Sequence, residues 1–198
     1  MTSVPPITQT ADLEQRTFRA MLSAMSMPGT VEQVSVARAE DGPWAAAIAV
    51  AQSLLDHEVT FHMAASNGPE ETILRRTGSR TAPPDRAAYV FADAAHALAA
   101  IEAAYEGPLE EPERSSTVVV LCDAVGEGDL ALTLSGPGVD GETTLRVGGL
   151  DPAVLKARTE RNWPFPTGID LLLVDPRGRL AALPRSTTAT IAAPQEVS

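Results

Sequence analysis

The chain has 198 residues, with 15 Lys or Arg and 26 Asp or Glu, so its formal charge is −11. This length is typical of one domain with one hydrophobic core. The acidic balance argues against binding to nucleic acid or to an anionic membrane surface, because both are bound mainly through Lys and Arg. An anionic small molecule is still compatible with it, because a local cluster of arginines can hold one.

Cysteine content and hydrophobic patterning narrow the class further. Cys122 is the only cysteine, which excludes an internal disulfide and a cluster of thiolate metal ligands. The longest apolar run, residues 44–51, is far shorter than the roughly 18 residues of a membrane span. The N-terminus has neither the basic nor the apolar part of a signal peptide. We therefore expect a soluble cytoplasmic protein.

The first half of the chain alternates between helical and strand patterns. Residues 1–11 lack periodicity, and we expect a flexible arm there. Asp12, with Gln15 three residues later, is typical of a helix N-cap, and Pro28 and Gly29 end this helix. The following elements are then expected in order: a strand over 30–37, a helix from Pro43 to about Leu55, a strand over 58–64, a short helix opened at 67–69 and closed at Gly78, and a strand over 88–92.

The second half is richer in strands. Asp93 is expected to cap a helix, and an exposed acidic loop over 105–116 follows it. Residues 117–122 are apolar on both faces, as in a central strand covered by helices. The remaining expected elements are strands over 129–135 and 142–147, a helix from 151–152, and a hairpin of strands 169–174 and 180–183 around a turn at 175–178. We expect the last dozen residues to be mobile.

This order predicts an α/β layered fold with a mixed sheet. The predicted single domain spans residues 12–190, and the flexible tail spans 191–198. The loop with Gly136, Gly138 and Gly141 matches a dinucleotide-binding pattern in letters, but β-prone residues follow where a phosphate-binding helix would begin. A strand-connecting loop is the favoured interpretation, although its backbone N–H groups can still face an anion.

Other patterns argue against a bound metal or cofactor. His57 and His62 are five residues apart in a predicted turn and strand, which does not match the spacing of a zinc-binding helix. His96 is expected to be a surface residue. Lys156, the only lysine, lies near Arg158 and Arg161 in a charged stretch typical of a solvated helix face. We therefore expect neither a metal site nor pyridoxal phosphate.

The segment from Arg161 to Asp170 combines polar, aromatic and proline residues. Trp163 and Phe165 can cover a pocket or a partner, and Gly168 permits an unusual backbone angle. Asp170 opens a central strand, where a carboxylate requires a partner, and Arg185 is the candidate. Two interpretations stay open for this segment: a buried tie between a loop and the strand end, or a contact with a substrate or a subunit.

Five segments resemble the PhnH family, which provides the H subunit of the bacterial carbon–phosphorus lyase system. They are Phe18-Arg-Ala-Met-Leu-Ser-Ala-Met-Ser-Met-Pro-Gly29, Leu54-Leu-Asp-His-Glu58, Leu134-Ser-Gly-Pro-Gly138, Pro164-Phe-Pro-Thr-Gly-Ile-Asp170 and Leu183-Pro-Arg-Ser-Thr-Thr188. The resemblance implies three α/β/α layers, similar to a minimal pyridoxal-phosphate-dependent transferase without the cofactor. It also implies a homodimer alone, and a larger complex with the G, I and J subunits.

The same resemblance implies a function in phosphonate catabolism. With the G, I and L proteins, the family is required to transfer methylphosphonate to the ribose C1 of ATP with release of adenine, which gives ribose 1-methylphosphonate 5-triphosphate. The resemblance also implies that the J subunit later cleaves the carbon–phosphorus bond by radical iron–sulfur chemistry. That step cannot reside in this chain, because an iron–sulfur cluster needs several thiolates and the chain has one cysteine. The transfer requires cations for the triphosphate and acid–base groups. The candidates are Arg19, Arg161 and Arg185 as cations, and Glu58 and Asp170 as carboxylates.

The spacing of these residues does not bring them into one site, so we expect an assembly or supporting role, with no turnover by the isolated chain. Two alternatives stay open. One is a self-sufficient transferase that acts on ATP and methylphosphonate alone. The other is a regulatory module that binds a nucleotide or another anion through Arg185.

Overall fold

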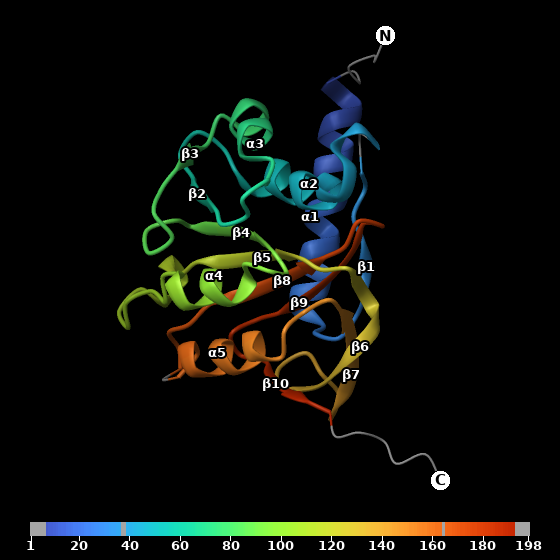
Figure 1. Cartoon of the computed structure of the whole chain (residues 1–198), viewed down its shortest axis with the longest axis vertical. Coiled ribbons are helices and arrows are strands. Elements are labelled where there is room, and N and C mark those ends of the chain that lie inside the picture. Colours follow the sequence, from blue (N-terminus) through green and yellow to red (C-terminus); the bar gives the residue numbers. More distant parts are fainter. Residues whose placement is uncertain (1–6, 37–38, 164, 193–198) are drawn as a thin grey trace.

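A mixed seven-stranded sheet lies at the centre of the computed structural model, which describes residues 7–36, 39–163 and 165–192 (Figure 1). Its strands, in spatial order, are β1 (Glu32–Gln33), β9 (Arg179–Leu183), β8 (Asp170–Val174), β5 (Thr117–Leu121), β4 (Tyr89–Asp93), β2 (Thr60–Met63) and β3 (Arg80–Thr81). Strands β8, β5, β4, β2 and β3 are parallel, and β9 is antiparallel to both neighbours. The predicted α/β class and mixed sheet are therefore confirmed.

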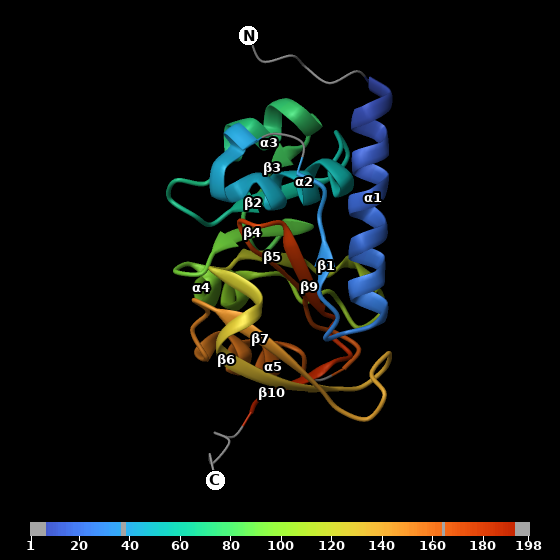
Figure 2. The same ribbon diagram turned by 90° about the vertical axis from the view of Figure 1, so that its right-hand side faces the viewer.

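Helices cover both faces of this sheet, as the doubly apolar central strand predicts. In β5, Val118 and Val120 pack into one core and Val119 into the other. The face of Val119 carries α1 (Ile7–Ser26), α2 (Ala45–Leu54) and α3 (Glu70–Thr77), and the opposite face carries α4 (Ala97–Ala103) and α5 (Ala153–Arg161). Figure 2 shows α1 running alongside β1 and β9 at one edge of the molecule. None of the described helices combines the length and the apolar character of a membrane span.

A second, three-stranded sheet corrects the expectation of one mixed sheet. It consists of β10 (Thr188–Ile191), β6 (Ala124–Ser135) and β7 (Thr143–Gly148). Its Leu132, Leu145 and Val147 join the core beneath α4 and α5. The alternation of residues 129–135 and 142–147 correctly predicted strands, but alternation specifies a buried face and not the sheet to which that face belongs.

The boundaries of several elements also differ from the predictions. Helix α1 begins at Ile7, so Asp12 lies inside it and pairs with Arg16 at 2.6 Å instead of capping it. The strand predicted over 30–37 is reduced to β1, and a 3-10 helix, η1 (Ala39–Trp44), precedes α2. The helix after Asp93 begins only at Ala97, because Asp93 Oδ1 accepts the backbone N–H of His96 and holds a turn there.

The two ends of the chain require a further correction. Residues 187–198 were predicted to be mobile, but β10 pairs with β6 from Thr188↔Ser135 to Ile191↔Leu132. Most of the predicted arm over 1–11 and of the predicted tail over 191–198 lies outside the described residues. The predicted hairpin is confirmed, with the N–H of Gly178 donating to the carbonyl of Asp175 at 3.0 Å. Gly78 ends α3 in the left-handed conformation, as predicted.

Candidate functional site

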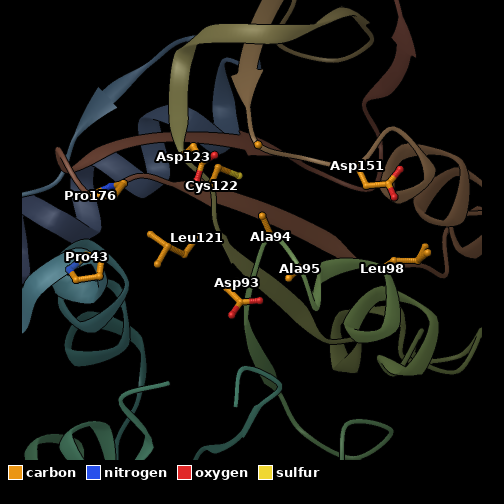
Figure 3. Close-up of a pocket in the computed structure, with 11 residues that line it drawn as sticks. Pro43, Asp93, Ala94, Ala95, Leu98, Leu121, Cys122, Asp123, Asp151 and Pro176 are labelled. Atoms are coloured by element: carbon orange, nitrogen blue, oxygen red, sulfur yellow. The ribbon is translucent and has the colours of Figure 1, made fainter. Parts of the chain in front are cut away.

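A cavity of about 600 Å³ lies at the carboxyl ends of the parallel strands (Figure 3). Open α/β sheets bind ligands at this edge. Leu98, Leu121 and Cys122 contribute apolar groups to the lining of the cavity, and three carboxylates also line it. These are Asp93 at the end of β4, Asp123 after β5 and Asp151 before α5, so three separate segments contribute them. The negative lining disfavours a phosphate group and favours hydroxyl or cationic groups.

A hydrogen-bonded chain of side chains starts at Asp93. Nδ1 of His96 lies 2.6 Å from Asp93 Oδ1, and Nε2 of His96 lies 3.5 Å from the hydroxyl of Ser66, which follows β2. With the proton on Nδ1, Nε2 is the hydrogen-bond acceptor for the hydroxyl of Ser66. His96 is partly exposed, as predicted, but its contacts with Asp93 and Ser66 were not foreseen. The available signal was a histidine three residues after an aspartate that ends a buried strand.

Cys122 is buried beside this cavity, with 2% of its surface exposed. Burial, followed by the charges of Asp123 and Asp175, raises the pKa of its thiol from 9.0 to about 12. The reactive thiolate is therefore absent at neutral pH. In the unfolded chain the thiol ionises at lower pH, so this group stabilises the fold below about pH 9, and its contribution is lost between about pH 9 and 12.

We therefore expect Cys122 to be inert towards a disulfide reagent in the native protein at pH 8. The same thiol should react stoichiometrically once guanidinium unfolds the chain. Absorbance of the released thiolate from Ellman's reagent measures both states. Rapid stoichiometric reaction of the native protein would contradict this prediction.

At the opposite, amino edge of the sheet, Arg185 and Asp170 form the predicted pair. Arg185 Nη2 lies 2.6 Å from Asp170 Oδ2, and the backbone N–H of Arg185 donates to Oδ1 at 2.7 Å. Arg185 Nη1 also donates to the carbonyl of Pro112 at 2.5 Å. Both side chains are mostly buried. Their groups are thus used within the chain, which favours a structural tie over a site for an anion.

Replacing Arg185 by alanine should therefore lower the free energy of unfolding by about 1–3 kcal/mol, because Asp170 is left without its partner. Urea denaturation measures this loss. The matched control is Arg177→Ala, which removes an exposed arginine paired with Glu127 and should cost well under about 1 kcal/mol. Unchanged stability together with lost ATP binding would instead support a ligand contact.

The arginines of α5 differ from the predicted solvated face. Arg158 is 2% exposed and donates to the carbonyls of Leu183, Pro184 and Thr187, and burial lowers its pKa to about 10. Arg161 forms an ion pair with Glu106 at 2.7 Å and donates to the carbonyl of Ala104. Lys156 is exposed, as predicted. Neither arginine is therefore free to bind an anion.

The loop between α5 and β8 presents its aromatic residues to solvent. Trp163 is 80% exposed and Phe165 is also exposed, whereas Gly168 is buried. Gly168 has a φ of 134°, and a Cβ there would collide with the side chain of Asn162. Asn162 Oδ1 accepts the N–H of Ile169 at 2.9 Å and fixes the entry into β8. Pro164 of the resembling motif lies outside the described residues.

The other predicted candidates lie neither at the cavity of the carboxyl edge nor beside the Arg185–Asp170 pair of the amino edge. Arg19 is exposed on α1, and Glu58 is exposed before β2, near His57. The loop with Gly136 and Gly138 packs against the end of α1, where a Cβ at Gly138 would overlap the carbonyl of Ser26. The interpretation as a strand-connecting loop is confirmed by its position between β6 and β7. Among the described residues, no group of three or more His, Cys, Asp or Glu is placed to hold a metal ion.

Comparison with known proteins adds the family. The family model described as bacterial phosphonate metabolism protein (PhnH) matches residues 5–190. A putative C-P lyase subunit protein, HtxG, of Stutzerimonas stutzeri is 37% identical over 181 residues, which is 89% of this chain and 86% of that protein. Subunit PhnH of the alpha-D-ribose 1-methylphosphonate 5-triphosphate synthase of Rhizobium meliloti (strain 1021) is 29% identical over 178 residues, 87% of this chain and 88% of that protein. The chain therefore belongs to the PhnH family of bacterial phosphonate metabolism proteins.

Proposed function

We propose that this protein is a subunit of a carbon–phosphorus lyase system, required for the transfer of methylphosphonate to the ribose C1 of ATP with release of adenine. The observation that carries this proposal is the family match over residues 5–190. It is supported by a relative named as a subunit of ribose 1-methylphosphonate 5-triphosphate synthase, because that compound is the product of the transfer. The proposed partners are the G, I and J subunits in the cytoplasm, with a homodimer when the protein is alone.

Within this complex, the role is assembly or support and not principal catalysis. Arg161 and Arg185 are engaged in ion pairs within the chain, so neither is free to neutralise a triphosphate. The carboxylates around the cavity at the carboxyl edge repel the same group. These observations weigh against the self-sufficient transferase, and the engagement of Arg185 weighs against the anion-binding module.

The proposal extends to the fold. A mixed sheet with helices on both faces is compatible with an architecture similar to that of pyridoxal-phosphate-dependent transferases, here formed by one domain over 12–190. The exposed position of Lys156 on α5 does not suit a Schiff base, which requires a lysine that loses its proton readily in a buried site.

Growth tests the proposed function. A bacterium that lacks its own H subunit should grow on methylphosphonate as sole phosphorus source when it carries this gene together with the G, I, J and L genes of the same source. Absence of growth with all proteins soluble and expressed would contradict the proposal. The isolated chain, mixed with ATP and methylphosphonate, should release no adenine. Release by the chain alone would instead support the self-sufficient transferase.

A further inference from the structure

Four apolar side chains are exposed on two loops at the amino edge of the sheet. Tyr105 and Leu109 follow α4, and Trp163 and Phe165 follow α5. Trp163 has the largest exposed fraction among the exposed large apolar residues of the described chain, 80%. We call these four residues the amino-edge surface. The two loops contact each other, because the N–H of Gly168 donates to the carbonyl of Glu106. Exposed apolar residues on adjoining loops mark interaction sites more often than scattered ones do.

The backbone beneath this surface is fixed by polar contacts between the two loops. The N–H of Gly168 donates to the carbonyl of Glu106 at 2.9 Å, and the Glu106 carboxylate pairs with Arg161 at 2.7 Å. The guanidinium of Arg185, anchored on Asp170, donates to the carbonyl of Pro112. The aromatic side chains are therefore presented on an ordered platform, which lowers the entropy lost on binding a partner.

The rim of the amino-edge surface is acidic. The loop after α4 carries Glu106, Glu110, Glu111 and Glu113. Glu106 and Glu111 pair with Arg161 and Arg114, whereas Glu110 and Glu113 are exposed and make no ion pair among the described residues. An apolar aromatic centre with a charged rim is the usual composition of a protein–protein interface. Charge complementarity then requires basic groups on the opposing surface.

We propose that the amino-edge surface docks a different protein subunit, one whose contacting face has an apolar centre and a basic rim. This inference rests on the proposed function, because it takes the chain to be a subunit. Trp163 and Phe165 supply the buried centre of the interface. Glu110 and Glu113 face the basic rim and accelerate association. The partner is thus held at the amino edge.

The test measures binding of the full chain to a purified complex of the G, I and J subunits, by surface-immobilised titration. W163A/F165A should weaken binding by at least about tenfold, because exposed aromatic anchors carry most of an interface's energy. The matched control is F18A/L22A, which removes two exposed apolar side chains of α1 beside Arg19 and should bind as the unaltered chain does. Unchanged thermal unfolding would show that W163A/F165A is folded.

A second experiment tests the contribution of the acidic rim. E110K/E113K should slow association several-fold at low salt, and this difference should shrink at high salt. D140K/E142K makes the same charge change on the exposed loop between β6 and β7 and should have little effect.

Full binding by W163A/F165A, or loss of binding by F18A/L22A alone, would overturn the docking proposal. So would a W163A/F165A chain that loses only self-association, because the surface would then cover a second copy. Failure of the unaltered chain to bind the complex would instead contradict the proposed function.

Discussion

Replacing Arg158 by alanine should lower the free energy of unfolding by about 3–5 kcal/mol, because the change removes a buried charged group whose partners stay buried. Arg158 Nη2 donates to the carbonyl of Pro184 at 2.5 Å and to those of Leu183 and Thr187 at 3.2 Å. The carbonyl of Leu183 ends β9, and those of Pro184 and Thr187 lie in the turn between β9 and β10. One side chain of α5 therefore supplies hydrogen bonds to the segment that joins the two sheets. Urea denaturation followed by circular dichroism measures the loss.

Two variants separate the lost hydrogen bonds from the lost volume. Arg158→Met keeps most of the aliphatic stem but donates nothing, so it should recover only part of the loss. Lys156→Ala removes an exposed side chain two residues away and should change stability by less than about 0.5 kcal/mol. An Arg158→Ala protein that unfolds at the same urea concentration as the unaltered chain would contradict this role.

Replacing Asp175 by alanine should have an effect of similar size, about 3–5 kcal/mol. This fully buried carboxylate lies in the β8–β9 turn, where Arg179 Nε donates to it at 2.6 Å. It also accepts the backbone N–H groups of Val125, Arg177 and Arg179. Val125 belongs to β6, so the carboxylate connects the hairpin of the main sheet with the second sheet.

The thermal midpoint should fall by roughly 10 °C in this variant, since 1 kcal/mol corresponds to about 2–4 °C at this chain length. Asp175→Asn keeps one carbonyl acceptor and should lose less than Asp175→Ala does. Glu127→Ala removes the exposed carboxylate that pairs with Arg179 and should barely shift the midpoint. Equal midpoints for Asp175→Ala and Glu127→Ala would show that the buried contacts contribute nothing.

Local patterns were sufficient for the elements whose signals lie within a few residues. The apolar run at 117–122 predicted a central strand because both of its faces are covered, and β5 is indeed the middle strand. The second sheet was missed because its assembly depends on the distant pairing of Thr188 with Ser135. The four residues of β10 carry only one buried side chain, Ala189, which is too weak a signal to stand out.

For the candidate sites, the sequence predicted one pair of residues correctly but not the role of that pair. A carboxylate at the start of a buried strand requires a partner, and this rule correctly joined Asp170 to Arg185. The rule did not decide their role, because the third member, the carbonyl of Pro112, comes from a loop 73 residues earlier. The solvated-face interpretation of Arg158 was wrong although Val154 and Leu155, four and three residues before it, share its buried helix face.

Strand β9 lies near the end of the chain, yet it supports the beginning. Strand β1 pairs with it, and α1 packs against it. A ribosome makes α1 before residues 179–183, and all the other helices and most of the other strands lie between the two. The contacts of α1 with α2 and β1 can form early in synthesis. Its contacts with β9 cannot form until residues 179–183 have been made. Proteins often fold from the N-terminus during synthesis; here α1 reaches its full packing only after a strand much later in the sequence has been made.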